Sequence, residues 1–303
     1  MKHAPKSTGE MLDSLRSAML AAIGNAPATL QATGKLERFD TARRGDKAGW
    51  YACHLTRWGM VARFGDWREG YAHKWSSFEE SSLSRSDLAE LKRIQHQQEQ
   101  ERQAEQSRRQ NAARDKAISI WCNAEPAGHT HPYLERKQVQ AHGIRQSLGN
   151  LVIPITDLSG NLHNLQIIKP DGAKRFLKGG RKRGLSFLFG ELAGAHGVII
   201  CEGWATGASL HEAYRLPVLV AFDAGSLLPV AQAFRRRFLN IPITLCADND
   251  RKTPGNPGLT KAREVSAQVP GVTLIVPEFT DNAPLSLSDF NDAVNFYRLG
   301  VAA

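Results

Sequence analysis

Apolar residues recur at helical spacing near the start of the chain. Between Ser7 and Ile23 they fall at every third or fourth position, and Gly24 follows, which predicts a helix that ends at this glycine. From Gly34 to Ser77 the pattern changes to short aromatic runs separated by glycines, namely GWYACHL, GMVARFGDW and GYAHKW. These runs predict strands joined by tight turns. We therefore expect a small α+β domain over residues 1–82.

The strands of this first domain hold four tryptophans, and two interpretations of them are open. Cationic side chains lie among the indole rings, and that combination is typical of a base-stacking platform for nucleic acid. The simpler interpretation is that the rings form the core of a small β-rich domain, and we favour it. The residues are Trp50, Trp58, Trp67 and Trp75, with Arg57, Arg63, Arg68 and Lys74.

Residues 83–123 have the pattern of one long polar helix. Gln, Glu and Arg predominate, Gly and Pro are absent from Ser86 to Cys122, and apolar residues are sparse between positions 95 and 116. A helix without an apolar stripe is typical of a solvated connector, and no heptad persists that would indicate a coiled coil. We expect this helix to join two separable halves.

The pattern of apolar runs in the second half changes near Gly197. Before it, in a subdomain over 124–195, short apolar runs alternate with turn residues and predict an antiparallel meander. After it, over 196–303, the runs GVIIC, VLVAF, ITLCA and VTLIV are apolar throughout and are separated by segments of helical length. This pattern predicts a buried parallel sheet with flanking helices. The fold class is therefore α/β, with the parallel sheet preceded by a β-rich subdomain, a helical connector and a small α+β domain.

Acidic residues follow directly after three of these predicted strands. Glu202 follows GVIIC, Asp223 follows VLVAF, and Asp248 and Asp250 follow ITLCA. Ligands gather at the carboxyl ends of parallel strands, and converging carboxylates repel one another unless a hard cation such as Mg²⁺ or Mn²⁺ is present. An Asp after a strand can instead cap the next helix, which is the role we expect for Asp223. For the other three we expect metal binding.

The charge balance indicates what kind of partner the protein binds. Lys and Arg number 39 against 30 Asp and Glu, and the formal net charge of +9 favours nucleic acid over a membrane. No apolar run approaches the roughly 20 residues needed to cross a bilayer, and no signal sequence with an apolar core is evident, so we expect a cytoplasmic protein. The four cysteines occur singly and predict neither a zinc ribbon nor a disulfide framework.

Several segments of the second half resemble the Toprim domain shared by bacterial primases, topoisomerases and certain nucleases. They are CEGWATGASL (201–210), the strand pair VLVAF and ITLCADND, and SDFND (288–292). Upstream, NLQIIKPDGAKRFLKGGRKRG (164–184) resembles the basic β segment of DnaG-type primases, while HPYLERKQV (131–139) and FGDWREG resemble the TraC-like primases of plasmids and phages. The resemblance implies a DNA primase that makes short RNA primers on single-stranded DNA from ribonucleoside triphosphates, in plasmid, phage or mobile-element replication.

The resemblance also implies roles for individual residues. Glu202 would act in nucleotidyl transfer, Asp248 and Asp250 would bind the metal with it, and either Asp289 or Asp292 would be the further acid. Template or incoming nucleotide would be held by the basic residues Lys169, Lys174, Arg175, Lys178, Arg181 and Lys182. From the residues alone, this basic segment is also compatible with a solvated loop, and we favour the functional interpretation.

The chain departs from the DnaG pattern in two respects. Asn249 replaces the glycine between the two aspartates, and residues 251–258 form a longer loop rich in Pro and Gly. A counterpart of the N-terminal zinc-binding module is missing. Two other functions therefore stay open: a Toprim nuclease that uses the same acids, and a non-catalytic DNA-binding replication factor. The sequence has no P-loop, so a replicative helicase would be a separate partner.

Overall fold

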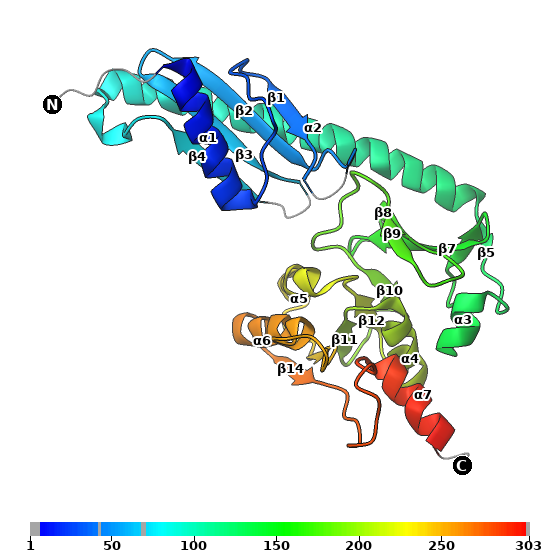
Figure 1. Ribbon diagram of the computed structural model, residues 1–303. Helices are drawn as coiled ribbons and strands as arrows, with labels where there is room; N and C mark the ends of the chain where they lie inside the picture. The colour runs from blue at the N-terminus through cyan, green and yellow to red at the C-terminus, as the bar shows by residue number, and fades with distance from the viewer. Residues whose placement is uncertain (1–6, 42–43, 68–70, 301–303) are drawn as a thin grey trace. The chain divides into compact units, whose positions relative to one another are not determined.

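The computed structural model describes residues 7–41, 44–67 and 71–300. The chain divides into two compact units, Met1–Ser107 and Arg108–Ala303 (Figure 1). Each unit has its own hydrophobic core. Helix α2 (Arg85–Asn123) runs through the boundary, with residues 85–107 in the first unit and 108–123 in the second. Among the helices that the structure describes, none combines the length and the apolar character that a membrane span requires.

The first unit contains a four-stranded antiparallel sheet with helix α1 (Thr8–Ile23) packed on one face. The strands follow one another in chain order: β1 (Leu36–Phe39), β2 (Gly49–Thr56), β3 (Gly59–Asp66) and β4 (Tyr71–Ser76). A short 3-10 helix, η1 (Glu80–Ser82), precedes α2. Helix α1 begins with a capping box between Ser7 and Glu10 and ends at Gly24, whose φ of 68° suits a residue without a side chain. The predicted helix and strands of this region are confirmed.

The tryptophans of the first unit take part in packing. Trp50 is 1% exposed, its ring centroid lies 5.3 Å from that of Trp67, and the guanidinium of Arg102 on α2 lies over both rings. Nearby, Arg63 of β3 pairs with Glu99 of α2 at 2.8 Å. These contacts support the core interpretation, because a ring covered by a helix cannot stack on a base. Arg68 and the end of the FGDWREG motif lie outside the described residues.

Helix α2 is the predicted long helix, but it is not solvated along its length. In the first unit Leu91 and Gln98 are 1% and 2% exposed. In the second unit Ala117 is fully buried and shares a core with Val152 and Leu165. Small residues let a backbone approach a sheet closely, and long polar side chains cover apolar surface with their stems, so the helix packs without a regular apolar stripe. The helix therefore packs on a core at each end, while most side chains of residues 95–116, the stretch expected to be solvated, are exposed or half-buried.

The β-rich part of the second unit is an antiparallel sheet of five strands in chain order, as the meander pattern predicts. The strands are β5 (Glu125–Pro126), β6 (Arg145–Ser147), β7 (Asn150–Thr156), β8 (Leu162–Ile168) and β9 (Lys174–Phe176). The short helix α3 (Pro132–Lys137) lies between β5 and β6 in the chain. The ring nitrogen Nδ1 of His131 accepts a hydrogen bond from the Tyr133 N–H and caps this helix.

The second sheet of this unit is mixed, with mostly parallel strands. Its order is β10 (Phe187–Phe189), β12 (Val218–Val220), β11 (Val198–Cys201), β13 (Ile243–Cys246) and β14 (Val272–Ile275). The four predicted parallel strands are all present, and β10 is antiparallel to β12. A parallel arrangement of β10 would need a crossover of a dozen or more residues before β11, and the segment 190–197 contains no helix.

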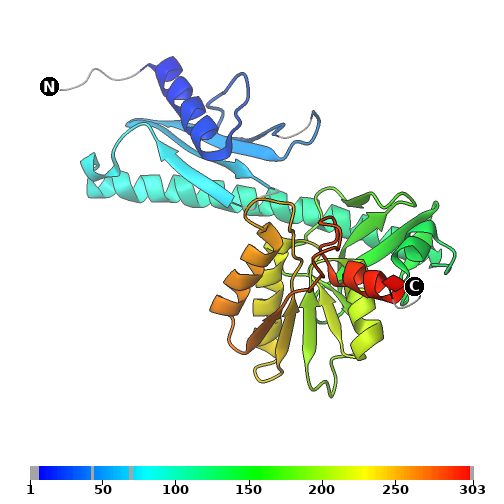
Figure 2. The same cartoon turned by 60° about the horizontal axis from the view of Figure 1, so that its bottom comes forward.

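Helices cover both faces of this sheet (Figure 2). On one side are α4 (Trp204–Tyr214) and α7 (Phe290–Gly300), and on the other are α5 (Ala224–Arg237) and α6 (Pro257–Gln268). Successive residues of β11 alternate between the two resulting cores. The core under α4 also contains side chains of β7 and β8, so the two sheets of the second unit share one hydrophobic interior.

Candidate active site

The carboxyl ends of β11 and β13 bring acidic residues to one edge of the sheet. The two strands are parallel neighbours, with Cys201 opposite Cys246, so Glu202 and the Asp248 segment leave the sheet side by side. The N–H of Asn249 donates to the carbonyl oxygen of Ser288 at 2.7 Å, and this bond brings the following Asp289 to the same edge. Acids from three distant parts of the sequence thus meet where a parallel sheet binds its ligands.

Burial and mutual repulsion raise the pKa values of these acids. Burial raises the pKa of Asp248 to about 8, with further contributions from the charges of Glu202, Asp289 and Asp250. The pKa of Glu202 rises to about 7 through burial and through the charges of Asp223 and Asp250. The pKa of Asp289 is also raised, mainly by burial. These acids therefore repel one another, and the positive charges nearby do not fully neutralise their negative charge.

Lys174 of β9 acts against this repulsion. Its positive charge lowers the pKa of Glu202, of Asp248 and of Asp289, so the lysine lies within electrostatic reach of all three. Its Nζ also lies 5.9 Å from the ring centroid of Tyr133 on α3. The β-rich sheet therefore places a cation from the basic segment beside the acids of the second sheet.

The acids offer the oxygen ligands that Mg²⁺ and Mn²⁺ prefer. Within residues 7–41, 44–67 and 71–300, no three His, Cys, Asp or Glu side chains are already arranged as a ligand set around one point. The donor chemistry nevertheless fits a cation, because Oδ1 of Asp248 is buried without a hydrogen-bond partner. A divalent ion would satisfy that oxygen and relieve the repulsion. The residues able to hold it are Glu202, Asp248, Asp250 and Asp289.

The start of α6 holds the Asp248–Asp250 segment in shape. Asn256 caps this helix, and its side chain accepts the Asp250 N–H at 3.0 Å and donates to the Asn249 side chain at 2.8 Å. The Gly258 N–H donates to Oδ2 of Asp250 at 3.2 Å. A Cβ atom on Gly258 would lie only 3.0 Å from the carbonyl oxygen of Asp248.

Asn256 and Gly258 are site residues that the sequence pattern did not reveal; it indicated only a loop longer than in DnaG-type primases. The signal that could have found them is the run Asn-Pro-Gly, since Asn is a strong N-cap and Pro favours the first helical position. A helix that starts there turns the N–H of Gly258 toward Asp250. The longer loop therefore ends in residues that hold Asp250 in place through hydrogen bonds.

Asp289 and Asp292 have different surroundings. Asp292 pairs with Lys137 of α3 at 3.2 Å and accepts the Ser288 N–H at 3.1 Å. Asp289 accepts the Asp292 N–H at 2.8 Å, and its charge contributes to the raised pKa of Asp248. The structure therefore brings Asp289 to the other acids and engages Asp292 with α3.

Asp223 does not have the capping role expected from the sequence. It occupies the N-cap position of α5, but its side chain makes no capping hydrogen bond. It forms an ion pair with Lys182 instead. A charged partner competes successfully with a neutral backbone N–H, so the prediction of a cap is wrong. The ion pair fixes the basic loop, residues 177–186 between β9 and β10, beside the start of α5.

The remaining residues of the predicted basic segment stay accessible to a polyanion. Lys182 is partly buried, and its Nζ lies 4.7 Å from the ring centroid of Phe176. The exposed residues are Lys169, Arg175, Lys178 and Arg181.

Residues 197–295 match the family model of the Toprim domain. This part of the chain is a Toprim domain. The chain is also 33% identical over 251 residues to a DNA primase TraC of Escherichia coli, an alignment that covers 78% of this chain and 23% of that protein. A second DNA primase TraC of Escherichia coli is 31% identical over 283 residues, covering 89% of this chain and 19% of the relative. The resemblance stated from the sequence is thus confirmed, although the chain spans less than a quarter of the length of these relatives.

Two solved structures are similar to this Toprim-containing chain at low identity. The DnaG primase catalytic domain bound to single-stranded DNA is 13% identical, with a TM-score of 0.43, over 66% of this chain and 78% of that chain. The primase fragment of the bacteriophage T7 primase-helicase protein is 16% identical, with a TM-score of 0.41, over 56% of this chain and 72% of that chain.

Proposed function

We propose that this protein is a DNA primase, a metal-dependent nucleotidyltransferase that synthesises short RNA primers on single-stranded DNA. The observation that carries the proposal is the acidic edge of the Toprim sheet with Lys174 beside it. The similarity to TraC primases over most of this chain supports the same activity. Its substrates are single-stranded DNA and ribonucleoside triphosphates, in the replication of a plasmid, phage or other mobile element, with a helicase as a separate partner.

The arrangement suits the chemical demands of primer synthesis. When bound, Mg²⁺ or Mn²⁺ would supply the Lewis acidity that activates a 3′-hydroxyl and the positive charge that neutralises a triphosphate. Glu202, Asp248, Asp250 and Asp289 would hold the metal in this proposal, and Asp292 would position Asp289 through its N–H, which donates to the Asp289 carboxylate. Lys174 supplies a fixed positive charge for a phosphate group of template or nucleotide. Without the metal, the same lysine offsets the charge of the acids.

The experiment that tests the proposal separates it from a Toprim nuclease. The whole protein is incubated with end-labelled single-stranded DNA and differently labelled ribonucleotides, in Mg²⁺ or Mn²⁺. We expect short ribonucleotide products and DNA of unchanged length. Shortened DNA without ribonucleotide products would identify a nuclease and overturn the proposal, since a hydrolase directs water, rather than a 3′-hydroxyl, to the same metal site.

A further inference from the structure

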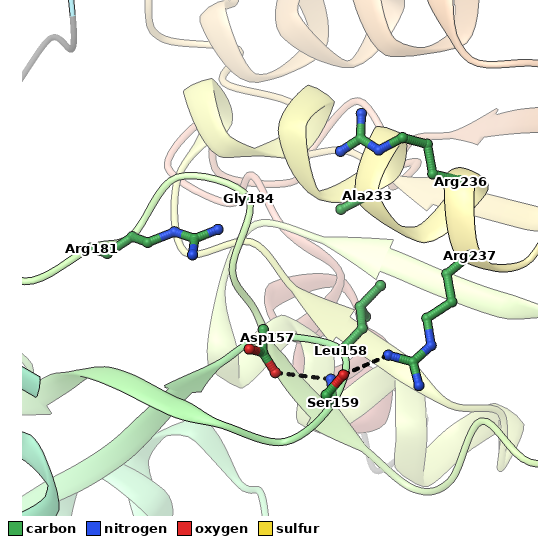
Figure 3. A pocket seen from close by; sticks show the side chains of 8 residues that line it. All are labelled: Asp157, Leu158, Ser159, Arg181, Gly184, Ala233, Arg236 and Arg237. Carbon is green, nitrogen blue, oxygen red and sulfur yellow. Dashed lines mark hydrogen bonds between the residues drawn. The ribbon is translucent and has the colours of Figure 1, made fainter. Parts of the chain in front are cut away.

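A pocket of about 340 Å³ lies in the second unit, where the turn between β7 and β8 meets the last turn of α5 (Figure 3). Three of its side chains are arginines, from the basic loop and from α5. In Figure 3, Arg181 lies on one side and Arg236 and Arg237 on the other, with the turn below. The lining residues are Asp157, Leu158, Ser159, Arg181, Gly184, Ala233, Arg236 and Arg237.

The carboxylate among these lining residues is engaged within its own turn. Asp157 accepts the N–H groups of Ser159 at 2.9 Å and of Asn161 at 3.0 Å, and it pairs with His163 at 3.0 Å. Burial would raise the pKa of Asp157, but these hydrogen bonds lower it to about 2. Hydrogen bonds within the turn therefore hold this carboxylate, while the pocket is lined by three arginines and a single acid. The pocket carries a net positive charge.

The three arginines keep most of their hydrogen-bonding capacity. Arg237 donates to the hydroxyl of Ser159 at 2.8 Å, a neutral partner. Arg181 and Arg236 are exposed, and neither forms an ion pair within the described part of the chain. Arg235, the preceding residue, instead bonds the carbonyl oxygens of Phe238 and Leu239. Arg235 therefore satisfies the carbonyl oxygens at the end of α5, so Arg236 and Arg237 can bind another ligand.

Helix α5 connects this pocket with the acidic edge of the sheet. Asp223, at the start of the helix, contributes to the raised pKa of Glu202, while Arg236 and Arg237 lie in its last turn. The helix has 14 residues, which corresponds to roughly 20 Å. Its length is about six phosphate spacings of a nucleic-acid strand. A nucleic-acid strand bound at the acids is long enough to reach the arginines in the last turn of the helix.

The basic loop runs beside the same helix. Lys182 pairs with Asp223 at the start of α5, and a Cβ atom on Gly184 would lie 3.7 Å from Cβ of Pro229 in its middle. Arg181 of this loop lines the pocket together with the end of the helix. The basic loop thus contributes one cation beside the acids, Lys182, and one to the pocket, Arg181.

We propose that this pocket binds a backbone phosphate of the single-stranded template and anchors the strand at a distance from the acidic edge. Guanidinium groups bind phosphate oxygens through paired, charge-assisted hydrogen bonds, and the Ser159 hydroxyl adds a donor. The identity of the strand as a template rests on the proposed function. The pocket itself is a site for nucleic-acid phosphate, distinct from the acids that hold the metal.

The test compares two double variants of the full chain. Arg236→Gln/Arg237→Gln removes two charges from the pocket, and Arg215→Gln/Arg298→Gln removes two exposed charges associated with the helices on the other face of the sheet. Affinity for an oligothymidylate is measured at several salt concentrations. We expect the slope of log affinity against log salt to fall by roughly 0.7 for each phosphate that the pocket variant no longer binds. The control should keep the wild-type slope.

Each outcome of this comparison supports or overturns the phosphate site. An unchanged slope in the pocket variant, or an equal fall in both variants, would overturn the inference. A loss of ribonucleotide affinity with unchanged DNA affinity would also overturn it, because the pocket would then hold a triphosphate. Arg236→Gln alone repeats the test if the double variant does not fold, since Arg236 forms no hydrogen bond with the residues that the structure describes. A selective loss of DNA affinity in a protein that makes no primers would support the pocket and refute the proposed function.

Discussion

Lys137 at the end of α3 and Asp292 in the first turn of α7 form an ion pair, with Nζ 3.2 Å from Oδ1. The side chain of Asn291 strengthens the same contact by donating to the main-chain oxygen of Lys137 at 2.7 Å. This contact joins the HPYLERK segment to the SDFND segment. It also fixes Asp289, which accepts the N–H of Asp292. We infer that Asp292 positions the acid that Asp289 contributes.

The two aspartates should respond differently to removal of charge. Asp289→Asn is expected to weaken Mn²⁺ binding by about tenfold or more, because it removes a charged oxygen ligand from the cluster. Asp292→Asn should lower the free energy of unfolding by about 1 kcal/mol through loss of the ion pair, with Mn²⁺ affinity changed only a few-fold. Mn²⁺ titration and urea unfolding of both variants measure these effects. Stronger loss of Mn²⁺ binding in Asp292→Asn would reverse the assignment.

Gly258 should be needed for the geometry of the acids rather than for the helix it starts. A Cβ atom there would lie 3.0 Å from the Asp248 carbonyl oxygen and 3.1 Å from Oδ2 of Asp250. Gly258→Ala is therefore expected to reduce Mn²⁺ affinity and primer yield several-fold. The free energy of unfolding should change little. The close contacts of the added methyl group destabilise the fold, but Ala is a better helix former than Gly by up to about 1 kcal/mol, which offsets that cost.

Gly9→Ala provides the matched control, since Gly9 also lies near the start of a helix. A Cβ atom on Gly9 would lie 3.9 Å from the Ser7 hydroxyl oxygen, which is an ordinary van der Waals contact. Wild-type Mn²⁺ binding is expected in this control. Wild-type Mn²⁺ affinity and primer yield in Gly258→Ala as well would show that the aspartates do not depend on the tight packing of this loop.

The metal-free protein should lose stability as the pH rises. The folded pKa values of Asp248 and Glu202, about 8 and about 7, lie above the roughly 4 of unfolded carboxyl groups. The native state therefore binds more protons between about pH 4 and 8, and the free energy of unfolding falls across that window. Metal binding must displace those protons, so Mn²⁺ affinity should rise over the same range.

Thermal unfolding of the metal-free protein from pH 5 to 8 checks this sign. Asp248→Asn should flatten the dependence and unfold at a higher temperature than wild type at pH 8, because it removes the repelled charge. A wild-type melting temperature that rises steadily from pH 5 to 8 without metal would contradict the electrostatic account of the site.

The parallel strands and the position of Glu202 could be predicted because their signals are local. A run such as GVIIC is apolar on both faces, and the first polar residue after it must lie at the strand end. The ion pair of Asp223 with Lys182 could not be predicted, since it depends on where a distant loop packs. The burial of Ala117 on α2 could not be predicted either, because small residues contribute almost nothing to a periodic hydrophobic pattern.

The local sequence also could not show which of Asp289 and Asp292 joins the other acids. Both lie in the same pentapeptide, and three residues of separation leave either one able to reach the acids. Lys137 decides between them, and it lies 155 positions away. Pairings of that range follow from the completed fold rather than from local pattern.

The most direct test of the central claim is the Mn²⁺ dependence of ribonucleotide incorporation on single-stranded DNA, measured for wild type and for Asp248→Asn. The claim is that the acids at the carboxyl ends of β11 and β13 hold the metal for nucleotidyl transfer. We expect wild type to make short RNA products with saturable Mn²⁺ dependence, and the folded variant to make at least about a hundredfold less, in line with the loss of one preorganised electrostatic group. Incorporation by Asp248→Asn within a few-fold of wild type, at the same Mn²⁺ concentration, would contradict the claim.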